Sequence, residues 1–294
     1  MTQGNQHVGT YQAAIETRLG AAGSLDDFCR KAQFVNYENI RAMFEAWNTK
    51  LWNDAAGLML WMSNPAHHST VWQTYDYDLD VNGTYYGARK GCEAIHVQAS
   101  LTDWQVLVAN HTTRALRGAT VTAGLYDLSG NALAAPQSQA VTAAPSSAVT
   151  LFTVGFAASM PSPHLLRLRL TGQQGELLSE NVYWRYRNPQ DMQALNRLPQ
   201  VPVSVSVHGP GRRRRNELTV TLRNDGHAVA AMVVLSLRDR RSGQRILPTF
   251  YSDNYLWLLP GETRDVTLSW RHAGQPLVPQ VLVNGYNLPR QGTP

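Results

Sequence analysis

Hydrophobic positions recur with a helical period in the first fifty residues. Residues 10–20 and 24–48 are predicted to be helices, and Ser24 followed three residues later by Asp27 is typical of a helix N-terminus. In the second segment, apolar residues recur at steps of three and four and form one apolar face: Leu25, Phe28, Ala32, Val35, Ala42 and Ala46. The chain therefore begins with two predicted amphipathic helices.

Residues 57–62 are a short, continuous apolar run that contains Trp61. This pattern is typical of a parallel strand that is buried on both faces. The Asn64-Pro65 pair ends the run and begins a loop that is rich in side chains able to stack on a sugar or hydrogen-bond to it: His67, His68, Trp72 and Tyr75. A turn at Asn82-Gly83 and a helix up to residue 95 are predicted to follow.

From residue 96 onward the period changes from that of a helix to that of a strand. Apolar residues alternate with polar neighbours, and turns are predicted at residues 127–131 and 171–175. The alternating positions are Val106, Val108, Val121, Ala123, Leu125, Leu166, Leu168 and Leu170. This pattern over about 100 residues predicts a β-sandwich at residues 96–190.

A second sandwich is predicted after a proline-containing linker at residues 188–200. Alternation resumes with turns at residues 241–244 and 259–263, at these positions: Val201, Val203, Val205, Val207, Leu218, Val220, Leu222, Val233, Leu235 and Leu237. Neither sandwich contains a cysteine, so neither can use the disulfide of antibody domains. The predicted divisions are residues 1–95, 96–190 and 191–294.

Composition places the chain among globular proteins. It has 294 residues, of which 43% are hydrophobic and 16% charged, and this length is sufficient for two or three cores. No apolar run approaches the roughly 20 residues of a membrane helix, so no membrane partner is expected. The polar start is no signal peptide; the protein is expected to be periplasmic or secreted if a longer precursor carries one. Cys29 and Cys92 are expected to be buried thiols.

The net charge of +5 is distributed unevenly, at −3, +2 and +6 for the three predicted divisions. The centre of the basic charge is the run Arg212–Arg215, which could bind a polyanion and which we interpret as a solvated loop. No aromatic residue is interleaved with these arginines, so nucleic acid is not an expected partner. A polycationic ligand would be repelled by this loop.

Several short motifs follow one another between residues 57 and 98: Trp61-Met62-Ser63-Asn64, Pro65, Ser69, Trp72-Gln73 and Tyr75-Asp76, then residues 85–90 and 93–98. Together they resemble the last barrel strand, loop and helix of glycoside hydrolase family 2, in its exo-β-D-glucosaminidase and β-mannosidase-like branch. Residues 25–28, 30–33 and 37–39 resemble the preceding barrel helix. His67 is a departure, because many members have a tryptophan shortly after the proline.

The resemblance implies a multidomain α+β protein, in which a terminal helix-strand-helix remnant of a (β/α)8 barrel precedes two immunoglobulin-like β-sandwiches. It also implies that Trp61 and Asn64 line the pocket around the nonreducing-end sugar, at the carboxyl end of a barrel strand where barrel active sites are built. Asn64 would donate to a hydroxyl and Trp61 would form an apolar wall. His67 and Trp72 are second choices, and the roles of Tyr75 and Asp76 are expected to be structural.

Retaining glycosidases need two carboxyl groups about 5 Å apart, and in the family both lie upstream of residue 57. We therefore expect no catalytic residue in this chain, no cofactor and no metal, since two adjacent histidines without a third ligand make a weak site. The predicted function is that of the C-terminal part of a retaining exo-acting glycoside hydrolase, which is inactive alone.

The expected partners are the remainder of the glycosidase barrel and a β-linked glucosaminide or mannoside. The alternative is a stand-alone carbohydrate- or protein-binding sandwich module, and a complete enzyme with novel catalytic residues is the third hypothesis.

Overall fold

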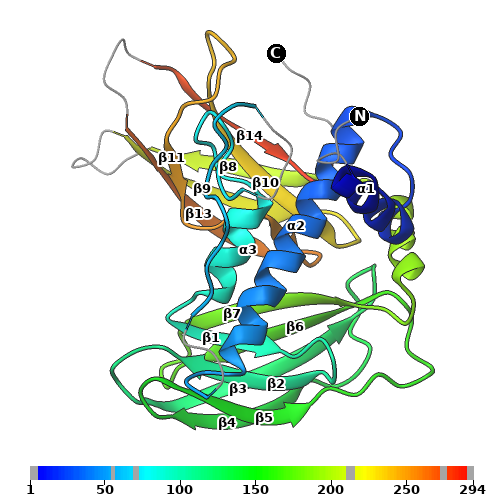
Figure 1. Cartoon of the computed structure of the whole chain (residues 1–294), viewed down its shortest axis with the longest axis vertical. Coiled ribbons are helices and arrows are strands. Elements are labelled where there is room, and N and C mark those ends of the chain that lie inside the picture. Colours follow the sequence, from blue (N-terminus) through cyan, green and yellow to red (C-terminus); the bar gives the residue numbers. More distant parts are fainter. Residues whose placement is uncertain (1–5, 54–56, 69–72, 210–215, 272–276, 290–294) are drawn as a thin grey trace. The chain divides into compact units, whose positions relative to one another are not determined.

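The computed structural model describes residues 6–53, 57–68, 73–209, 216–271 and 277–289 (Figure 1). The chain divides into two compact units, and each unit is discontinuous in sequence. The first unit contains Met1–Trp61 and Gly87–Leu195, and the second contains Met62–Tyr86 and Asn196–Pro294. No helix within the described ranges is both long enough and apolar enough to cross a membrane.

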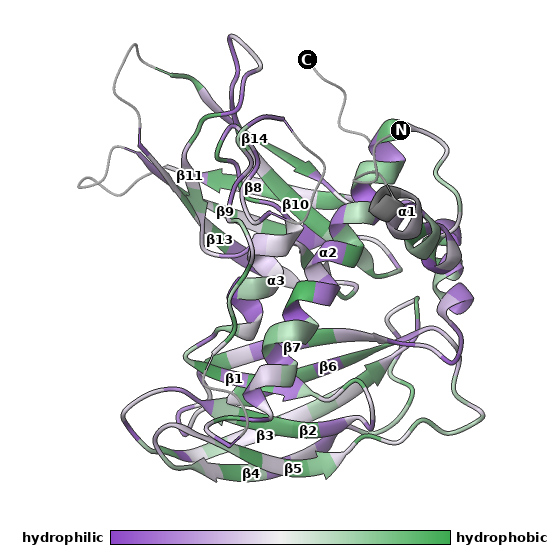
Figure 2. Cartoon of the chain, in the orientation of Figure 1, coloured by the Kyte–Doolittle hydropathy of each residue, from purple (hydrophilic) through white to green (hydrophobic). Residues whose placement is uncertain are grey.

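The two predicted N-terminal helices are confirmed as α1 (Gln6–Leu19) and α2 (Leu25–Asn48). Ser24 caps α2, because its hydroxyl accepts a hydrogen bond of 3.2 Å from the backbone N–H of Asp27. Figure 2 shows hydrophobic and hydrophilic residues alternating around α2. The apolar face predicted for this helix is only partly correct, because Ala32 and Val35 are buried whereas Leu25 and Ala46 are exposed. The buried face also contains polar and charged residues: Lys31, Glu38, Arg41, Glu45 and Asn48.

Helix α3 (Gly83–Gly91) follows the predicted turn and packs against α2 through two glycines. A Cβ on Gly87 would lie 2.3 Å from the carbonyl oxygen of Tyr37, and one on Gly91 would lie 2.6 Å from the Cβ of Phe44. Real side chains do not tolerate such distances, so the two helices approach each other at positions where only glycine fits.

The first predicted sandwich is confirmed and lies in the first unit. Its sheets have the strand orders β1-β2-β5 and β4-β3-β6-β7, and every pairing is antiparallel. The strands are β1 (Ile95–Ala99), β2 (Gln105–Asn110), β3 (Leu116–Tyr126), β4 (Gln137–Ala143), β5 (Ser147–Thr153), β6 (His164–Thr171) and β7 (Leu177–Arg185). All eight residues whose alternation predicted these strands are buried.

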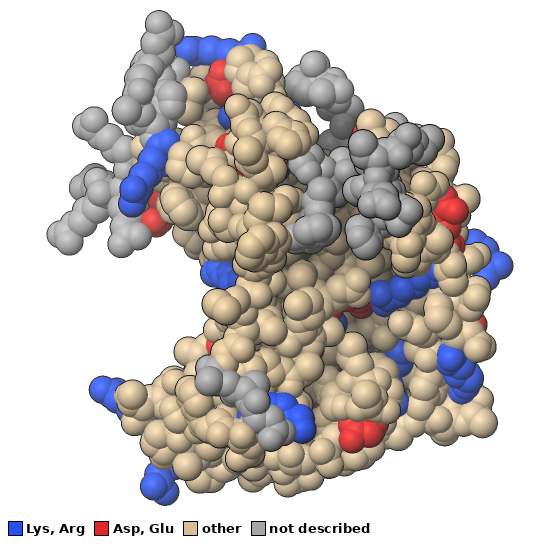
Figure 3. Space-filling view, viewed as in Figure 1, with Lys and Arg blue, Asp and Glu red and all other residues tan. Residues whose placement is uncertain are grey.

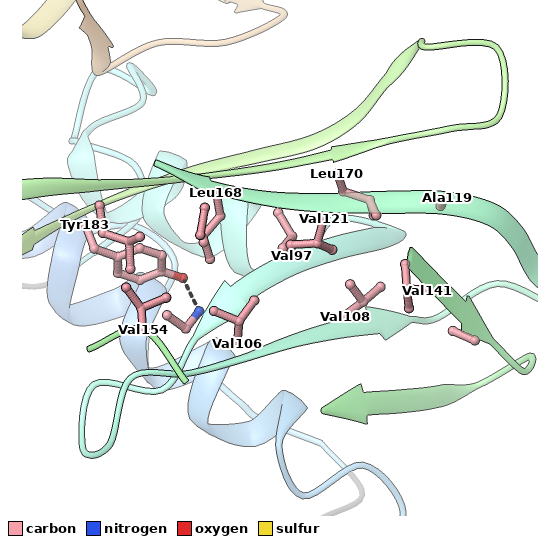
Figure 4. Packing of buried hydrophobic residues seen from close by; sticks show 14 of the residues in the cluster. Val97, Val106, Val108, Ala119, Val121, Val141, Val154, Leu168, Leu170 and Tyr183 are labelled. Carbon is pink, nitrogen blue, oxygen red and sulfur yellow. Dashed lines mark hydrogen bonds between the residues drawn. The ribbon is translucent and has the colours of Figure 1, made fainter. Parts of the chain in front are cut away.

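The core of this sandwich is built from both sheets (Figure 4). Val97 and Val106 come from one sheet, and Val121 and Leu168 come from the other. The hydroxyl of Tyr183 reaches across the core and accepts a hydrogen bond of 3.1 Å from the backbone N–H of Ala99. A buried polar group is thereby satisfied within an otherwise apolar layer.

The second predicted sandwich is confirmed in the second unit, with strand orders β12-β10-β14 and β11-β13-β9-β8. Its strands are β8 (Val203–His208), β9 (Glu217–Asn224), β10 (Ala230–Asp239), β11 (Thr249–Tyr251), β12 (Leu256–Leu258), β13 (Thr263–Trp270) and β14 (Pro279–Asn284). The predicted turns contain Gly243 and Gly261, which have φ angles of 71° and 75°. These left-handed conformations explain why glycine stands at both positions.

The region predicted to be a linker, residues 188–200, contains regular structure. A 3-10 helix, η2 (Pro189–Arg197), occupies most of it, and two of its residues, Met192 and Leu195, are buried. The prolines at both ends of this segment predicted an irregular connection. The segment is instead helical, and it is held in place by the burial of its two apolar side chains.

The prediction of a buried strand at residues 57–62 is wrong. The segment has no strand structure, and the side chains of Met59 and Trp61 are 96% and 78% exposed. A parallel strand forms by pairing with neighbouring parallel strands and is covered by helices on both faces. Every named strand pairing in the described residues is antiparallel and belongs to one of the two sandwiches.

The prediction that Cys29 and Cys92 are buried is also wrong, because both are free and exposed. The buried face of α2 begins at Lys31, so Cys29 lies off it. The Arg212–Arg215 run lies outside the described residues. On the face seen in Figure 3, the Lys and Arg side chains are scattered rather than gathered into one patch.

Candidate functional site

The residues predicted to contact a sugar lie between residues 61 and 72. Trp61 is the last residue of the first unit, whereas Asn64 and His67 belong to the second unit, and all three are exposed. The hydroxyl of Ser63 donates a hydrogen bond of 3.0 Å to the side-chain oxygen of Asn64. Trp72 lies outside the described residues. The three described side chains are accessible to solvent, as contact with a ligand requires.

Asn64 and His67 lie on a segment that we call the site loop, which consists of the described residues 62–68 and 73–82. Its described ends are joined at Ser63, whose carbonyl oxygen accepts hydrogen bonds from the backbone N–H of Tyr75 at 2.9 Å and the hydroxyl of Thr74 at 3.0 Å. Asn82 donates to the carbonyl oxygen of Gln73 at 2.8 Å and also accepts from the N–H of Tyr85 in α3. The bonds to Ser63 connect the two described parts of the loop at the residue before Asn64.

A tight turn follows in the site loop, at residues 76–80. The backbone N–H and the carboxylate of Asp76 bond to the carbonyl oxygen and the N–H of Asp80, each at 2.9 Å. Leu79 has a φ angle of 64°, a left-handed conformation that is unusual for a branched side chain. Tyr75 and Val81 pair as an isolated antiparallel bridge on either side of the turn.

Three aspartates of this turn converge on one guanidinium group from the second sandwich, that of Arg245. Its NH1 lies 2.9 Å from a carboxylate oxygen of Asp76 and 2.8 Å from one of Asp80, and its NH2 lies 2.8 Å from one of Asp78. We call these four residues the Arg245 cluster. Burial opposes the charge of Arg245, but hydrogen bonds to Asp76 and the charge of Asp80 raise its pKa.

Within the same cluster, burial raises the pKa of Asp80, while the charge of Arg245 acts in the opposite direction. Asp76, for which a structural role was expected, accepts a hydrogen bond from Arg245. The part played by Arg245 was missed. The sequence feature that could have indicated a basic partner is the group of three aspartates in residues 76–80. Arg245, about 165 positions later, partly neutralises their charge.

The adjacent histidines of the site loop have separate surroundings. His68 lies 3.6 Å from a carboxylate oxygen of Asp78, and its ring lies 4.6 Å from that of Tyr77. His67 is exposed to solvent. Within the described ranges, no group of three or more His, Cys, Asp or Glu residues is arranged to hold a metal ion.

A second polar cluster lies in the first unit, between α2 and the first sandwich, and we call it the Glu45 network. One oxygen of Glu45, Oε1, accepts hydrogen bonds from Asn181 at 2.6 Å and Tyr183 at 2.8 Å, and it lies 3.1 Å from Nε2 of His96. Nδ1 of His96 lies 2.9 Å from Oε2 of Glu93. No sequence pattern indicated this network, because its members lie on α2, on the segment before β1, and on the strands β1 and β7.

Burial and charge decide the protonation states in the Glu45 network. Burial opposes the charged form of His96, but hydrogen bonds to Glu45 and Glu93 raise the pKa of the ring. Burial likewise opposes ionisation of Glu93, yet His96 and Lys90 together lower its pKa to about 2. His96 is fully buried and Glu45 nearly so, and a substrate therefore cannot reach them. The network connects α2 to the first sandwich and has a structural role.

Comparison with known proteins relates both sandwiches to glycosidases. Residues 181–288 match the family described as the exo-beta-D-glucosaminidase Ig-fold domain, and residues 102–186 match the mannosidase Ig/CBM-like domain. An exo-beta-D-glucosaminidase from Amycolatopsis orientalis is 34% identical over 306 residues, which cover 96% of this chain. By sequence, the chain is a homologue of the exo-β-D-glucosaminidases of glycoside hydrolase family 2.

Two further comparisons agree with this relationship, which the motifs at residues 57–98 had indicated. An exo-beta-D-glucosaminidase from Streptomyces avermitilis is 34% identical over 97% of the chain. The crystal structure of the Amycolatopsis orientalis exo-chitosanase CsxA superposes with a TM-score of 0.86 and 32% identity over 95% of the chain. The chain spans only about a third of these glucosaminidases: 30% and 34% of the two sequences and 36% of the solved structure.

Proposed function

We propose that the chain is the C-terminal part of a retaining, exo-acting glycoside hydrolase that cleaves a β-linked glucosaminide or mannoside. In this proposal residues 1–95 complete a catalytic barrel, and residues 96–190 and 191–294 are accessory sandwiches. The observation that carries the proposal is the similarity of 95% of the chain to 36% of an exo-chitosanase. The remaining two thirds of such an enzyme would supply the rest of the barrel.

Exposed apolar side chains in the first unit support a partner of this kind. Large hydrophobic residues that globular proteins usually cover are open to solvent: Leu25, Met43, Trp52, Met59 and Trp61. Exposed apolar surface of this kind is typical of an interaction site. Residues 57–62 have the composition of a buried parallel strand, so we propose that they pair and become covered when the other barrel strands are present.

The distribution of carboxylates supports the inactivity of the chain alone. A retaining mechanism needs a nucleophile and an acid/base about 5 Å apart and both open to the sugar. In the described part of the site loop, Asp76, Asp78 and Asp80 are all bonded to Arg245. We therefore propose that the loop supplies contacts to the sugar, through Asn64 and His67, rather than the catalytic pair.

The test is complementation. The purified chain is assayed on an aryl β-D-glucosaminide and an aryl β-D-mannoside, alone and mixed with a separately purified fragment that carries the rest of a barrel. We expect no turnover alone and activity in the mixture. Asn64→Ala and Trp61→Ala should each lower the restored kcat/KM about tenfold, the effect of one lost hydrogen bond or contact of about 1.4 kcal/mol.

The matched control is Arg117→Ala, a change at an exposed residue of β3 that should leave the restored activity unchanged. Turnover by the chain alone that survives repurification would favour a complete enzyme with catalytic residues of its own. A mixture without activity would show that the chain does not complete this barrel.

A pocket in the first unit favours the alternative, a carbohydrate-binding module. The pocket has a volume of about 230 Å³, and its wall includes the half-buried rings of Trp104 and Tyr186 and the polar side chains of Arg18 and Asn39. Aromatic faces beside hydrogen-bonding groups are suited to a pyranose ring. Calorimetric titration with a glucosamine disaccharide tests this. Asn39→Ala is expected to weaken binding, and Asn53→Ala, at an exposed residue outside the pocket wall, is expected to leave it unchanged.

A further inference from the structure

We propose that Arg245 is a positioning residue: by holding Asp76, Asp78 and Asp80, it fixes the site loop and thereby places Asn64 against the sugar. This inference rests on the proposed function, in which the site loop contacts the substrate. It gives the last sandwich a specific task, which is to provide a rigid anchor for a loop of the substrate site.

The cluster uses the fork shape of the guanidinium group. NH1 bonds to two carboxylates and NH2 bonds to the third, at 2.8 to 2.9 Å. Arginine is suited to such a task because its planar group presents several N–H donors in fixed directions, whereas a lysine ammonium is a point charge. Arg245, Asp76 and Asp80 are half-buried and Asp78 is exposed, so each pair alone is partly screened by solvent, and the arrangement acts as a network.

The backbone on the Arg245 side of the cluster is fixed by the second sandwich. Arg245 follows the tight turn at Gly243 and pairs with Arg238 of β10, which is the central strand of the β12-β10-β14 sheet. The next residue, Ile246, is buried, and its N–H donates to the carbonyl oxygen of Leu237 at 2.9 Å. The anchor is therefore bonded to a strand of a sheet, through one bridge and the adjacent backbone hydrogen bond of Ile246.

The site loop has much less structure of its own. In the described part before α3, its regular pairing is the single bridge between Tyr75 and Val81, and Leu79 adopts a strained left-handed conformation. A loop without helix or strand structure takes part of its shape from external contacts, in addition to its own hydrogen bonds. In this case three such contacts come from one side chain of the sandwich.

A short path leads from the cluster to the sugar-contacting residue. Asp76 is adjacent to Tyr75, whose backbone N–H bonds to the carbonyl oxygen of Ser63 at 2.9 Å, and Asn64 is the next residue. A shift of Asp76 therefore moves the backbone that carries Asn64. Because a displacement of about 1 Å is enough to lower a rate substantially, loss of Arg245 should reduce activity although Arg245 itself touches no substrate.

The first experiment measures amide hydrogen exchange in the complete 294-residue chain. Arg245→Gln should increase the exchange rates of Tyr75 and Asp80, whose N–H groups bond within the loop, by about tenfold or more. Arg245→Lys should give an intermediate increase. The amides of β9 and β13 should keep their rates, which shows that the sandwich remains folded.

The matched control is Arg223→Gln in the same sandwich. Arg223 forms its ion pair, of 3.1 Å, with Asp225 and not with an aspartate of the site loop. This change should leave the exchange of Tyr75 and Asp80 unaltered. If Arg245→Gln also leaves them unaltered while the sandwich is intact, Arg245 does not position the loop and the inference is overturned.

The second experiment tests the link to the sugar in the complemented enzyme. Arg245→Gln should lower kcat/KM about tenfold, and Arg245→Lys should recover part of the loss. In a variant that already carries Asn64→Ala, the further change at Arg245 should have little effect, because it acts through Asn64. Additive losses would overturn the link. If the wild-type mixture shows no activity, the proposed function fails, and the exchange measurement still decides whether Arg245 holds the loop.

Discussion

Nε2 of His96 lies 3.1 Å from an oxygen of Glu45, while Nδ1 of the same ring lies 2.9 Å from an oxygen of Glu93. The ring is fully buried and both of its nitrogens face carboxylates, so the network stabilises the charged imidazolium. His96 is on the first strand of the sandwich and Glu45 is on α2, so the interaction of the protonated ring with Glu45 connects the helix to the sheet.

This arrangement predicts that the first unit loses stability as the pH rises. The pKa of His96 is raised in the folded state, so its contribution is complete below an unfolded pKa of about 6.5 and is lost as the pH rises through the higher folded value. Urea unfolding from pH 6 to pH 9 should show this loss in the wild type. His96→Gln should flatten the dependence, whereas His208→Gln, at an exposed position, should preserve it.

The contact between α3 and α2 predicts a cost for any side chain at Gly87. Gly87→Ala should destabilise the first unit by about 1–3 kcal/mol, because its Cβ would overlap the carbonyl oxygen of Tyr37 and force the helices apart. Gly9→Ala is the control, since a Cβ on this exposed residue of α1 meets nothing within 4 Å. Calorimetry should show a lower Tm for the first variant and an equal or higher Tm for the second.

The core of the first sandwich predicts a larger effect at Leu168. This side chain is fully buried between the sheets, so Leu168→Ala should lower the free energy of unfolding by about 2–5 kcal/mol. Leu177→Ala, at a residue that is 42% exposed at the start of β7, should cost much less. Chemical denaturation followed by circular dichroism measures both, and equal losses would contradict the packing described here.

The exposed segment at residues 57–62 predicts self-association in the absence of a partner. Met59 and Trp61 are open to solvent, so dimers or aggregates should appear at micromolar concentration in light scattering. Met59→Gln combined with Trp61→Gln should reduce them, and Leu177→Gln should not. Amides of residues 58–61 should exchange much faster than those of β2 or β6, and slow exchange there would indicate a self-sufficient strand.

The elements that the sequence predicted well are those decided by local chemistry. Alternation placed Val121 and Leu168 in the core, Ser24 marked the start of α2, and Gly243 and Gly261 marked turns. In each case the information lies within a few residues of the position concerned.

The failures have a different physical origin. Residues 57–62 were expected to be a buried strand, but strand pairing depends on neighbours rather than on the segment itself. Cys29 was misplaced because a small shift in the helical face exposes a residue that the pattern would bury. The convergence of three aspartates on Arg245 depends on the folding of distant segments, and one sequence contains no measure of that distance.

The pairing of Asp76 with Arg245 also has a consequence for the order of events during synthesis. The two residues are 169 positions apart, so a ribosome must add most of the remaining chain before the aspartates of the turn can meet their cation. Closure of so long a loop is entropically slow relative to local pairing. The first sandwich can therefore fold before the Arg245 cluster forms. The backbone that carries Asn64 then becomes ordered among the last parts of the nascent protein.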